Sequence, residues 1–191
     1  MRIKGGEKLT DFKWLNLFNI HYVDSHDTER QWQVATRHKH PKCMTGQFAI
    51  PDAVVIVPFH IGRGKIVMTR EFRVPLAGFE YGFPAGLIDD GETVEAATRR
   101  ELYEETGLSV VQILKISPPI YSSAGMTDEA VTMVFVECEG LPSAAANEGA
   151  EQIEVILASP SEIAIMCRDS ALKFDAKAWL VLSEFAEKGS L

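Results

Sequence analysis

Three glutamates crowd onto one face of a predicted helix in the segment RRELYEETG, residues 99–107. At 100° per residue, Glu101, Glu104 and Glu105 fall within an arc of roughly 100°. Like charges three or four residues apart destabilise a helix by about 0.2–0.5 kcal/mol per pair, and no lysine four residues further on offsets them. Hard divalent cations such as Mg²⁺ bind carboxylate oxygens and share them with substrate phosphates. The cluster therefore predicts a metal site, with a solvated acidic face as the alternative.

The spacing upstream of this helix decides between the two alternatives. Gly86 is followed by five residues and Glu92, and then by seven residues and the segment RELYEETGL, residues 100–108. This pattern resembles the box of the Nudix hydrolases, Gx5Ex7REUxEExGU, at every fixed position. The resemblance implies a loop–helix–loop metal site that cleaves a nucleoside diphosphate linked to another group. It also implies that Glu92 and Arg100 orient the loop and the helix, and that Gly86 lets the backbone turn closely.

The metal ligands are carried over from the family position by position. Glu101 and Glu105 match the main ligands, Glu104 matches an additional one, and the carbonyl of Ala85 is the expected backbone ligand. Mg²⁺ is the expected cofactor, and Mn²⁺ is possible in its place.

The segment EFRVPLAGFEYGFPAGLIDDGET, residues 71–93, resembles the ADP-ribose pyrophosphatase branch of the family. That branch forms homodimers in which N-terminal β units build each other's adenine sites, so Trp14 and Trp32 are candidates to stack on the base, with Arg37 nearby. Arg73 is expected to bind a phosphate through its fork of donors. Gly125, with Thr127 and Glu129, is expected on the sugar side of the pocket, and an ordinary turn followed by a strand is the alternative. Packing in the core or at the dimer interface is the alternative for each tryptophan, and a surface ion pair is the alternative for Arg73.

The attacking water needs a group that orients it, which the branch takes from an acidic residue in a loop after the box. The matching segment SAAANEGAEQIEV contains Glu148, Glu151 and Glu154. Glu151 precedes the last predicted strand by a suitable distance and is the preferred candidate, with Glu148 second. Stray glutamates are common in such loops.

Two departures from the branch leave the substrate open. Gly82 stands where many relatives have glutamate, with Glu80 on the same face two residues earlier, and Ala124 stands at the position of a characteristic proline. ADP-ribose, hydrolysed to AMP and ribose 5-phosphate, is the expected substrate. GDP-mannose, a dinucleotide or a damaged nucleotide are alternatives. A nucleotide sensor without activity and a capped-RNA hydrolase are less favoured.

The composition fits a globular chain and disfavours two classes of partner. The 191 residues are 46% hydrophobic and carry a net charge of −8, which disfavours nucleic acid and anionic lipid as partners. The three cysteines lack metal-site spacing and are expected as buried reduced thiols. No apolar stretch has the length of a membrane span, and the N-terminal segment lacks the apolar core of a signal peptide. We therefore expect a cytoplasmic protein.

The predicted elements form an α/β Nudix fold, a mixed sheet layered between helices, with an N-terminal β-hairpin unit. We expect the N-terminal unit at residues 1–48 and the hydrolase domain at 49–191. Periodicity and capping residues predict hairpins at 12–37 and 51–74, a short strand near 80–83, strands at 108–117, 130–139 and 153–158, and helices at 93–107, 161–168 and 175–189.

Overall fold

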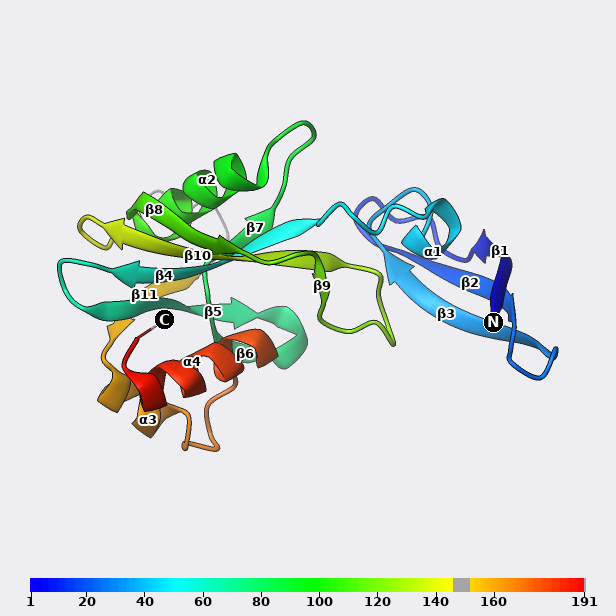
Figure 1. Ribbon diagram of the computed structural model, residues 1–191. Coiled ribbons are helices and arrows are strands. Elements are labelled where there is room, and N and C mark those ends of the chain that lie inside the picture. The colour runs from blue at the N-terminus through cyan, green and yellow to red at the C-terminus, as the bar shows by residue number, and fades with distance from the viewer. Residues whose placement is uncertain (146–151, 191) are drawn as a thin grey trace. The chain divides into compact units, whose positions relative to one another are not determined.

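A computed structural model describes residues 1–145 and 152–190, and the chain forms two compact units (Figure 1). The N-terminal unit contains Met1–Asp52 and Pro119–Val131, and the large unit contains Ala53–Pro118 and Thr132–Leu191. The sequence-based boundary after residue 48 lies four residues before Asp52, where the first segment of the N-terminal unit ends. Residues 119–131, by contrast, return to the N-terminal unit, which no feature of the sequence indicates.

The N-terminal unit is built on a three-stranded antiparallel sheet, β1 (Arg2–Lys8), β2 (Asn16–Val23) and β3 (Glu29–Thr36). The expected hairpin is confirmed as β2 and β3, in which apolar and polar residues alternate. Phe18, Ile20 and Val34 form the small core on one face of this sheet. β1 has no signal in the sequence, because RIKGGEK contains two glycines and no apolar alternation, and tertiary pairing makes it a strand.

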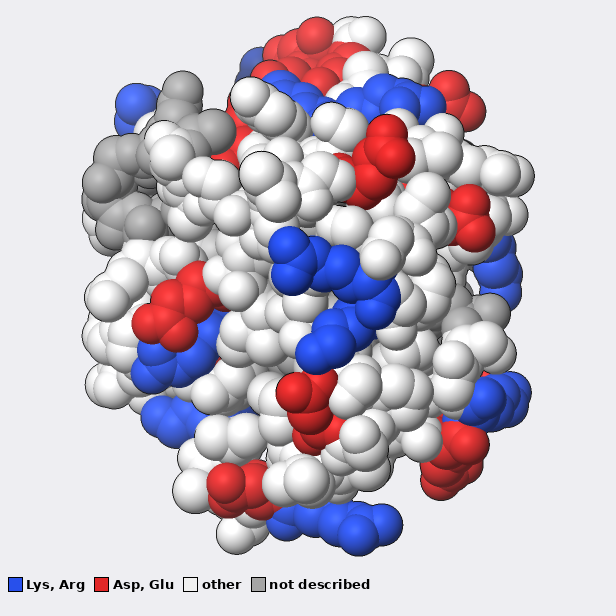
Figure 2. Space-filling view, turned by 90° about the vertical axis from the view of Figure 1, so that its left-hand side faces the viewer, with Lys and Arg blue, Asp and Glu red and all other residues white. Residues whose placement is uncertain are grey.

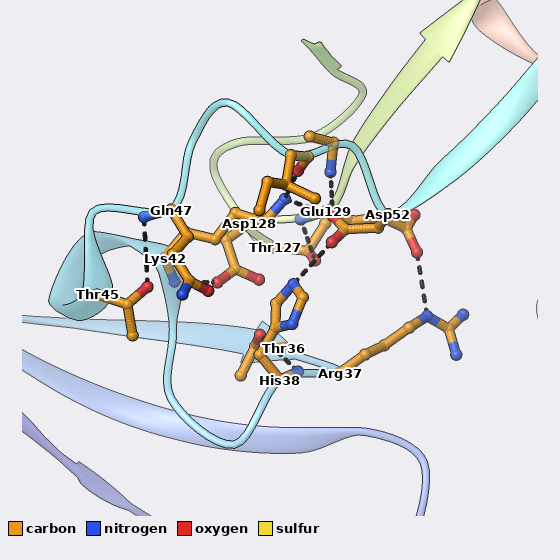
Figure 3. A network of polar contacts seen from close by, with 12 residues as sticks. Thr36, Arg37, His38, Lys42, Thr45, Gln47, Asp52, Thr127, Asp128 and Glu129 are labelled. Carbon is orange, nitrogen blue, oxygen red and sulfur yellow. Dashed lines mark hydrogen bonds and ion pairs between the residues drawn. The ribbon is translucent and has the colours of Figure 1, made fainter. Parts of the chain in front are cut away.

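A buried lysine organises the segment after β3, which was expected as a loop and contains the short helix α1 (Lys42–Thr45) (Figure 3). The Lys42 side chain is 2% exposed, and its Nζ donates to Asp52 Oδ2 at 2.8 Å and to the Ile50 carbonyl at 2.9 Å. The other carboxylate oxygen of Asp52 lies 2.7 Å from His38 Nε2. A buried charge is tolerated when it is paired and hydrogen-bonded in this way.

The same carboxylate binds residues 119–131 to the N-terminal unit. The Ala130 N–H donates to Asp52 Oδ2 at 2.7 Å, and Asp128 accepts from the Lys42 backbone N–H at 2.7 Å. Within this segment, β9 (Ile120–Tyr121) pairs with the first residues of β10 (Ala130–Glu139). The Asp52 side chain thus binds the backbone of a residue that lies 78 positions later in the sequence.

The large unit contains most of the remaining secondary structure. Its elements are β4 (Ala53–His60), β5 (Lys65–Arg73), the 3₁₀ turn η1 (Val74–Leu76), β6 (Gly78–Gly82), β7 (Ala85–Leu87), α2 (Val94–Thr106), β8 (Ser109–Ile116), β11 (Ile153–Ala158), α3 (Pro160–Met166) and α4 (Ala176–Lys188). The predicted hairpin, strands and helices are confirmed within a few residues, whereas the three-residue β7 was not predicted.

The large unit confirms the expected α/β architecture. Its strand order is β11-β5-β4-β10-β8, with β6 paired to β5 and β7 paired to β4. Figure 1 shows β4 and β10 running in the same direction, whereas the β11–β5, β5–β4 and β10–β8 pairs are antiparallel, so the sheet is mixed. In the same view, α2 lies on one side of this sheet, and α3 and α4 lie on the other.

The helix α2 is fixed at both ends and along its buried face. Thr93 caps its start by accepting from the Ala96 N–H at 3.1 Å, and Gly107 ends it with φ 68°, as the sequence predicts. Its apolar face joins a core that consists of Val54, Ile56, Val67, Ala97, Leu102, Leu108, Val134, Val136 and Cys138. Cys138 is therefore buried as expected, whereas Cys43 and Cys167 are only partly buried.

Charges are interspersed on the side of the molecule where β4 turns into β5. Figure 2 shows lysine and arginine side chains there lying among aspartates and glutamates rather than in one continuous basic patch. Lys65 at the start of β5, for example, pairs with Glu162 of α3 at 3.0 Å. Among the helices of the described chain, none combines the length and the apolar character that a bilayer crossing requires.

We expect Asp52→Asn to lower the free energy of unfolding by about 3 kcal/mol, because it leaves the buried Lys42 ammonium without an anionic partner. Urea denaturation followed by tryptophan fluorescence measures this change. Glu139→Gln, at an exposed glutamate, is the control and should change the stability by less than about 0.5 kcal/mol. An unfolding midpoint of Asp52→Asn equal to that of the wild type would contradict the expectation.

Candidate functional site

The loop before α2 and the helix itself are held by the sheet. β7 pairs with β4, so that Ala85 lies opposite Val55 and Gly86 lies opposite Val54. From the other side, Ala97 and Leu102 of α2 pack into the core described above. The loop and the acidic face of α2 are thereby brought together by two rigid elements, which is the support that a precise binding site needs.

A close approach, rather than a special backbone angle, explains the glycine at position 86. A Cβ atom added there would lie 1.9 Å from both Cδ and Oε1 of Glu101, far inside van der Waals contact. The Glu101 carboxylate therefore lies directly against the loop backbone. Any side chain at position 86 would push this carboxylate away.

Arg100 ties the loop to the helix. Its Nε and Nη2 donate to the two carboxylate oxygens of Glu92 at 2.9 and 2.8 Å, and Nη2 also donates to the Leu87 carbonyl at 3.0 Å. This bidentate arrangement is the geometry in which arginine binds carboxylates most strongly. The guanidinium hydrogen bonds lower the pKa of Glu92, and the same contacts raise that of Arg100. The sequence-based role of both residues as organisers of the loop fits this geometry.

The remaining nitrogen of Arg100 reaches the acidic face. Nη1 donates to Glu101 Oε1 at 2.7 Å and to Glu104 Oε2 at 3.2 Å, while Glu105, 8% exposed, accepts from the Ala85 N–H at 3.3 Å. Burial raises the pKa of Glu101, and Arg100 opposes that rise. One guanidinium thus offsets part of the repulsion between the clustered carboxylates.

These donors fit a hard divalent cation. Three carboxylates lie on adjacent turns of one helix, and the Glu101 carboxylate fills a notch that only glycine leaves open. Within the described residues, no three acidic, histidine or cysteine side chains already converge as a ready metal cluster. Arg100 instead occupies one oxygen of Glu101 and one of Glu104. Ala85 as a backbone ligand stays a prediction.

Arg73 lies on the same face of the sheet as α2. Val67 of β5 packs against α2, and strand alternation places Glu71 and Arg73 on the same face as Val67. Arg73 Nη1 lies 2.8 Å from Glu71 Oε1, and Arg73 Nε lies 3.6 Å from Glu80 Oε2. The ion pair that the sequence analysis kept as an alternative is therefore present, and Glu71 is a partner that the sequence analysis missed. Its position two residues before Arg73 on one strand was the available signal.

The other candidates on described residues belong to the N-terminal unit. Trp32 lines a cavity of about 550 Å³ together with Tyr22, Phe48, Ala124 and other residues of the same unit. Trp14 is 70% exposed and is not among the residues that line this cavity. Trp32 is thus placed in a cavity that can receive a planar group, whereas Trp14 is presented to solvent.

Arg37 directly follows β3, and Gly125 lies within residues 119–131. Arg37 Nε donates to Glu129 Oε1 at 3.1 Å, and the two side chains remain partly exposed. Gly125 has open space where a Cβ would be. Both residues therefore remain available to a ligand of the N-terminal unit.

The candidates for orienting water are placed only in part. Glu148 and Glu151 lie outside the described residues, so their role stays a prediction. Glu154 lies on β11 and pairs with Arg70 of β5 at 2.9 Å. Glu154 alternates with Val155, which packs against the core on the α2 side, so Glu154 points to the opposite face.

Comparisons with known proteins identify similar sequences and a matching family model. Residues 50–180 match the family model described as NUDIX domain. The ADP-ribose pyrophosphatase of Saccharomyces cerevisiae is 34% identical over 134 residues, which cover 70% of this chain and 56% of that protein. The GDP-mannose pyrophosphatase of Pectobacterium atrosepticum is 31% identical over 148 residues, covering 72% and 74%. The chain thus spans little more than half the length of the yeast relative.

A solved structure shares the fold. The crystal structure of an ADP compounds hydrolase matches 97% of this chain and 93% of its own, with a TM-score of 0.74 at 19% identity. At this identity the likeness bears on the fold alone, and it confirms the predicted architecture.

We expect Gly86→Ala to weaken Mn²⁺ binding about 10–100-fold, because the added Cβ displaces the Glu101 carboxylate. Isothermal titration calorimetry with Mn²⁺ measures the affinity, and circular dichroism checks the fold. The matched control is Gly62→Ala, where a Cβ meets only ordinary contacts at 3.5 Å. Unchanged Mn²⁺ affinity in a folded Gly86→Ala protein would refute the assignment.

Proposed function

The chain belongs to the Nudix family, and we propose that it hydrolyses the pyrophosphate bond of nucleoside diphosphate sugars, with ADP-ribose as its main substrate. The observation that carries this proposal is the intact acidic face of α2, pressed against the Gly86 loop and organised by Arg100. The name of the yeast relative supports ADP-ribose as the substrate. We infer that the chain is an enzyme rather than a sensor because each fixed position of the box is present.

The carboxylates of α2 are the groups that hold the cofactor. Glu101, Glu104 and Glu105 would bind Mg²⁺, or Mn²⁺ in its place, and Arg100 keeps two of these side chains oriented. Bound ions would supply positive charge to the diphosphate and would make the attacking water more acidic. Positioning and electrostatic stabilisation then supply most of the rate enhancement, as in phosphoryl transfer generally.

Hydrolysis forms a bond from the water oxygen to one phosphorus and breaks the bridging P–O bond. The water proton passes to a carboxylate, for which Glu151 is our candidate and Glu148 the second. ADP-ribose would give AMP and ribose 5-phosphate. Arg73 would bind a phosphate through its remaining guanidinium donors, because its ion pairs with Glu71 and Glu80 involve only Nη1 and Nε.

We further propose that the N-terminal unit binds the base and that two copies of the chain associate through it. The cavity beside Trp32 is apolar and aromatic, which suits stacking on a nucleobase. The 70% exposure of Phe12 and of Trp14 supports association, because large apolar side chains at an interface become buried. Arg37 and Gly125 would complete this part of the site.

A second nucleotide sugar is the main alternative substrate. The Pectobacterium relative is named a GDP-mannose pyrophosphatase, and this chain covers 74% of it. Steady-state kinetics with ADP-ribose, GDP-mannose and capped RNA would rank these substrates. A preference for guanine over adenine would overturn the ADP-ribose assignment, and binding without turnover would favour a sensor.

We expect Glu101→Gln and Glu105→Gln each to lower kcat for ADP-ribose at least about a hundredfold, because each removes a charged ligand from the site. Release of AMP, measured by chromatography at saturating Mg²⁺, gives kcat. Glu95→Gln, at an exposed position in the first turn of the same helix, should leave kcat unchanged. Full activity of both ligand variants would refute the mechanism.

Removal of divalent ions provides an independent test. We expect EDTA to abolish hydrolysis, and Mg²⁺ or Mn²⁺ added in excess to restore it, because the carboxylates of α2 have no catalytic role without a cation. Hydrolysis that continues at the original rate in EDTA would show that the reaction does not depend on a metal.

A further inference from the structure

The turn at the end of β5 brings Arg73 and its two carboxylate partners together on the α2 face of the sheet. Glu71 and Arg73 lie on this face, and β6 pairs with β5 so that Glu80 lies opposite Glu71 and Gly78 lies opposite Arg73. Directly opposed residues of an antiparallel pair point their side chains to the same side. The space above Gly78 therefore adjoins the side chain of Arg73.

Lys173 fills that space from a distant part of the chain. The segment before α4 runs beside β6, because the Tyr81 N–H donates to the Lys173 carbonyl at 2.7 Å and the Asp175 N–H donates to the Tyr81 carbonyl at 2.9 Å. The Lys173 Nζ lies 3.1 Å from the position that a Cβ of Gly78 would occupy. The Lys173 ammonium thus lies over Gly78, the residue directly opposite Arg73.

The two cations differ in how far they are neutralised. Arg73 contacts both Glu71 and Glu80, as described above. Lys173 is exposed and donates from Nζ to the Leu76 carbonyl at 2.7 Å, and within the described residues no carboxylate forms an ion pair with it. An ammonium has three donors, so two remain for an anion. Lys173 is therefore the less compensated charge on this face.

The turn that Lys173 binds is strained. Ala77 follows η1 with φ 44°, a left-handed conformation that residues other than glycine seldom adopt. Such strain persists where the surroundings hold the backbone, and it concentrates at binding sites. The bond from Lys173 to the Leu76 carbonyl, one residue before Ala77, is one such restraint.

We propose that Lys173 is a second phosphate-binding residue, which together with Arg73 receives the diphosphate of the substrate. This inference rests on the proposed function for the identity of the substrate, but the anion site itself does not require hydrolysis. Arg73 supplies a planar fork that Glu71 and Glu80 hold in place, and Lys173 supplies an adjacent point charge from another segment.

The test compares Lys173→Gln with Lys173→Arg. We expect Lys173→Gln to weaken the binding of inorganic pyrophosphate and of ADP about tenfold in EDTA, where no turnover occurs, as followed by ³¹P NMR titration. The KM for ADP-ribose should rise by a similar factor, with kcat within about twofold. Lys173→Arg should restore most of the affinity, because it keeps the charge.

Controls separate binding from folding. Lys65→Gln removes a lysine at the far end of β5 that pairs with Glu162, and it should leave pyrophosphate affinity unchanged. Gly78→Ala crowds the ammonium without removing it, so its affinity should fall by a smaller factor. Pyrophosphate affinity equal to that of the wild type in folded Lys173→Gln protein would overturn the proposal. A wild-type protein that binds pyrophosphate but hydrolyses no nucleotide sugar would instead refute the proposed function.

Discussion

Repulsion between carboxylates is the constraint around which the site is built. Glu101, Glu104 and Glu105 are held close together by a helix whose other face is buried, so they cannot move apart without unpacking the core. Arg100 reduces this repulsion because its Nη1 donates to Glu101 and Glu104, while its Nη2 donates to Glu92. One guanidinium thereby connects the loop before α2 to the helix and orients two of the carboxylates. In the proposed mechanism, this excess negative charge in a rigid frame is what would make cation binding favourable.

The same arrangement occurs again on the neighbouring strands. Glu71 and Glu80 face each other across β5 and β6, a pairing that is unfavourable by itself, and Arg73 lies against both. In each cluster an arginine is shared among carboxylates, which orients the guanidinium. Arg100 uses all five of its N–H donors, whereas Arg73 contacts its two carboxylates through Nη1 and Nε. The two clusters lie on one face of the sheet, so a diphosphate placed there would meet the proposed metal site of α2 on one side and the Arg73 guanidinium on the other.

Local patterns explain why much of this structure follows from the sequence. The ends of α2 at Thr93 and Gly107 were predictable because capping chemistry acts over a few residues, and the box spacing fixed the acidic face. Contacts between distant segments left no such trace. Lys173 reaches Gly78 only because the chain before α4 runs beside β6, and β1 is a strand only through its partner β2. The buried Lys42 likewise resembles any surface lysine until its surroundings are known.

The return of residues 119–131 to the N-terminal unit has a consequence for the order of folding. On the ribosome, β1, β2 and β3 emerge early, yet Ala130, whose N–H donates to Asp52, is added only after the whole of α2 has been made. Until then the lysine–aspartate pair lacks part of its hydrogen-bonding shell. The N-terminal unit therefore completes late in synthesis despite its position, and a nascent chain that stalls before residue 130 exposes an unfinished polar interior to chaperones and proteases.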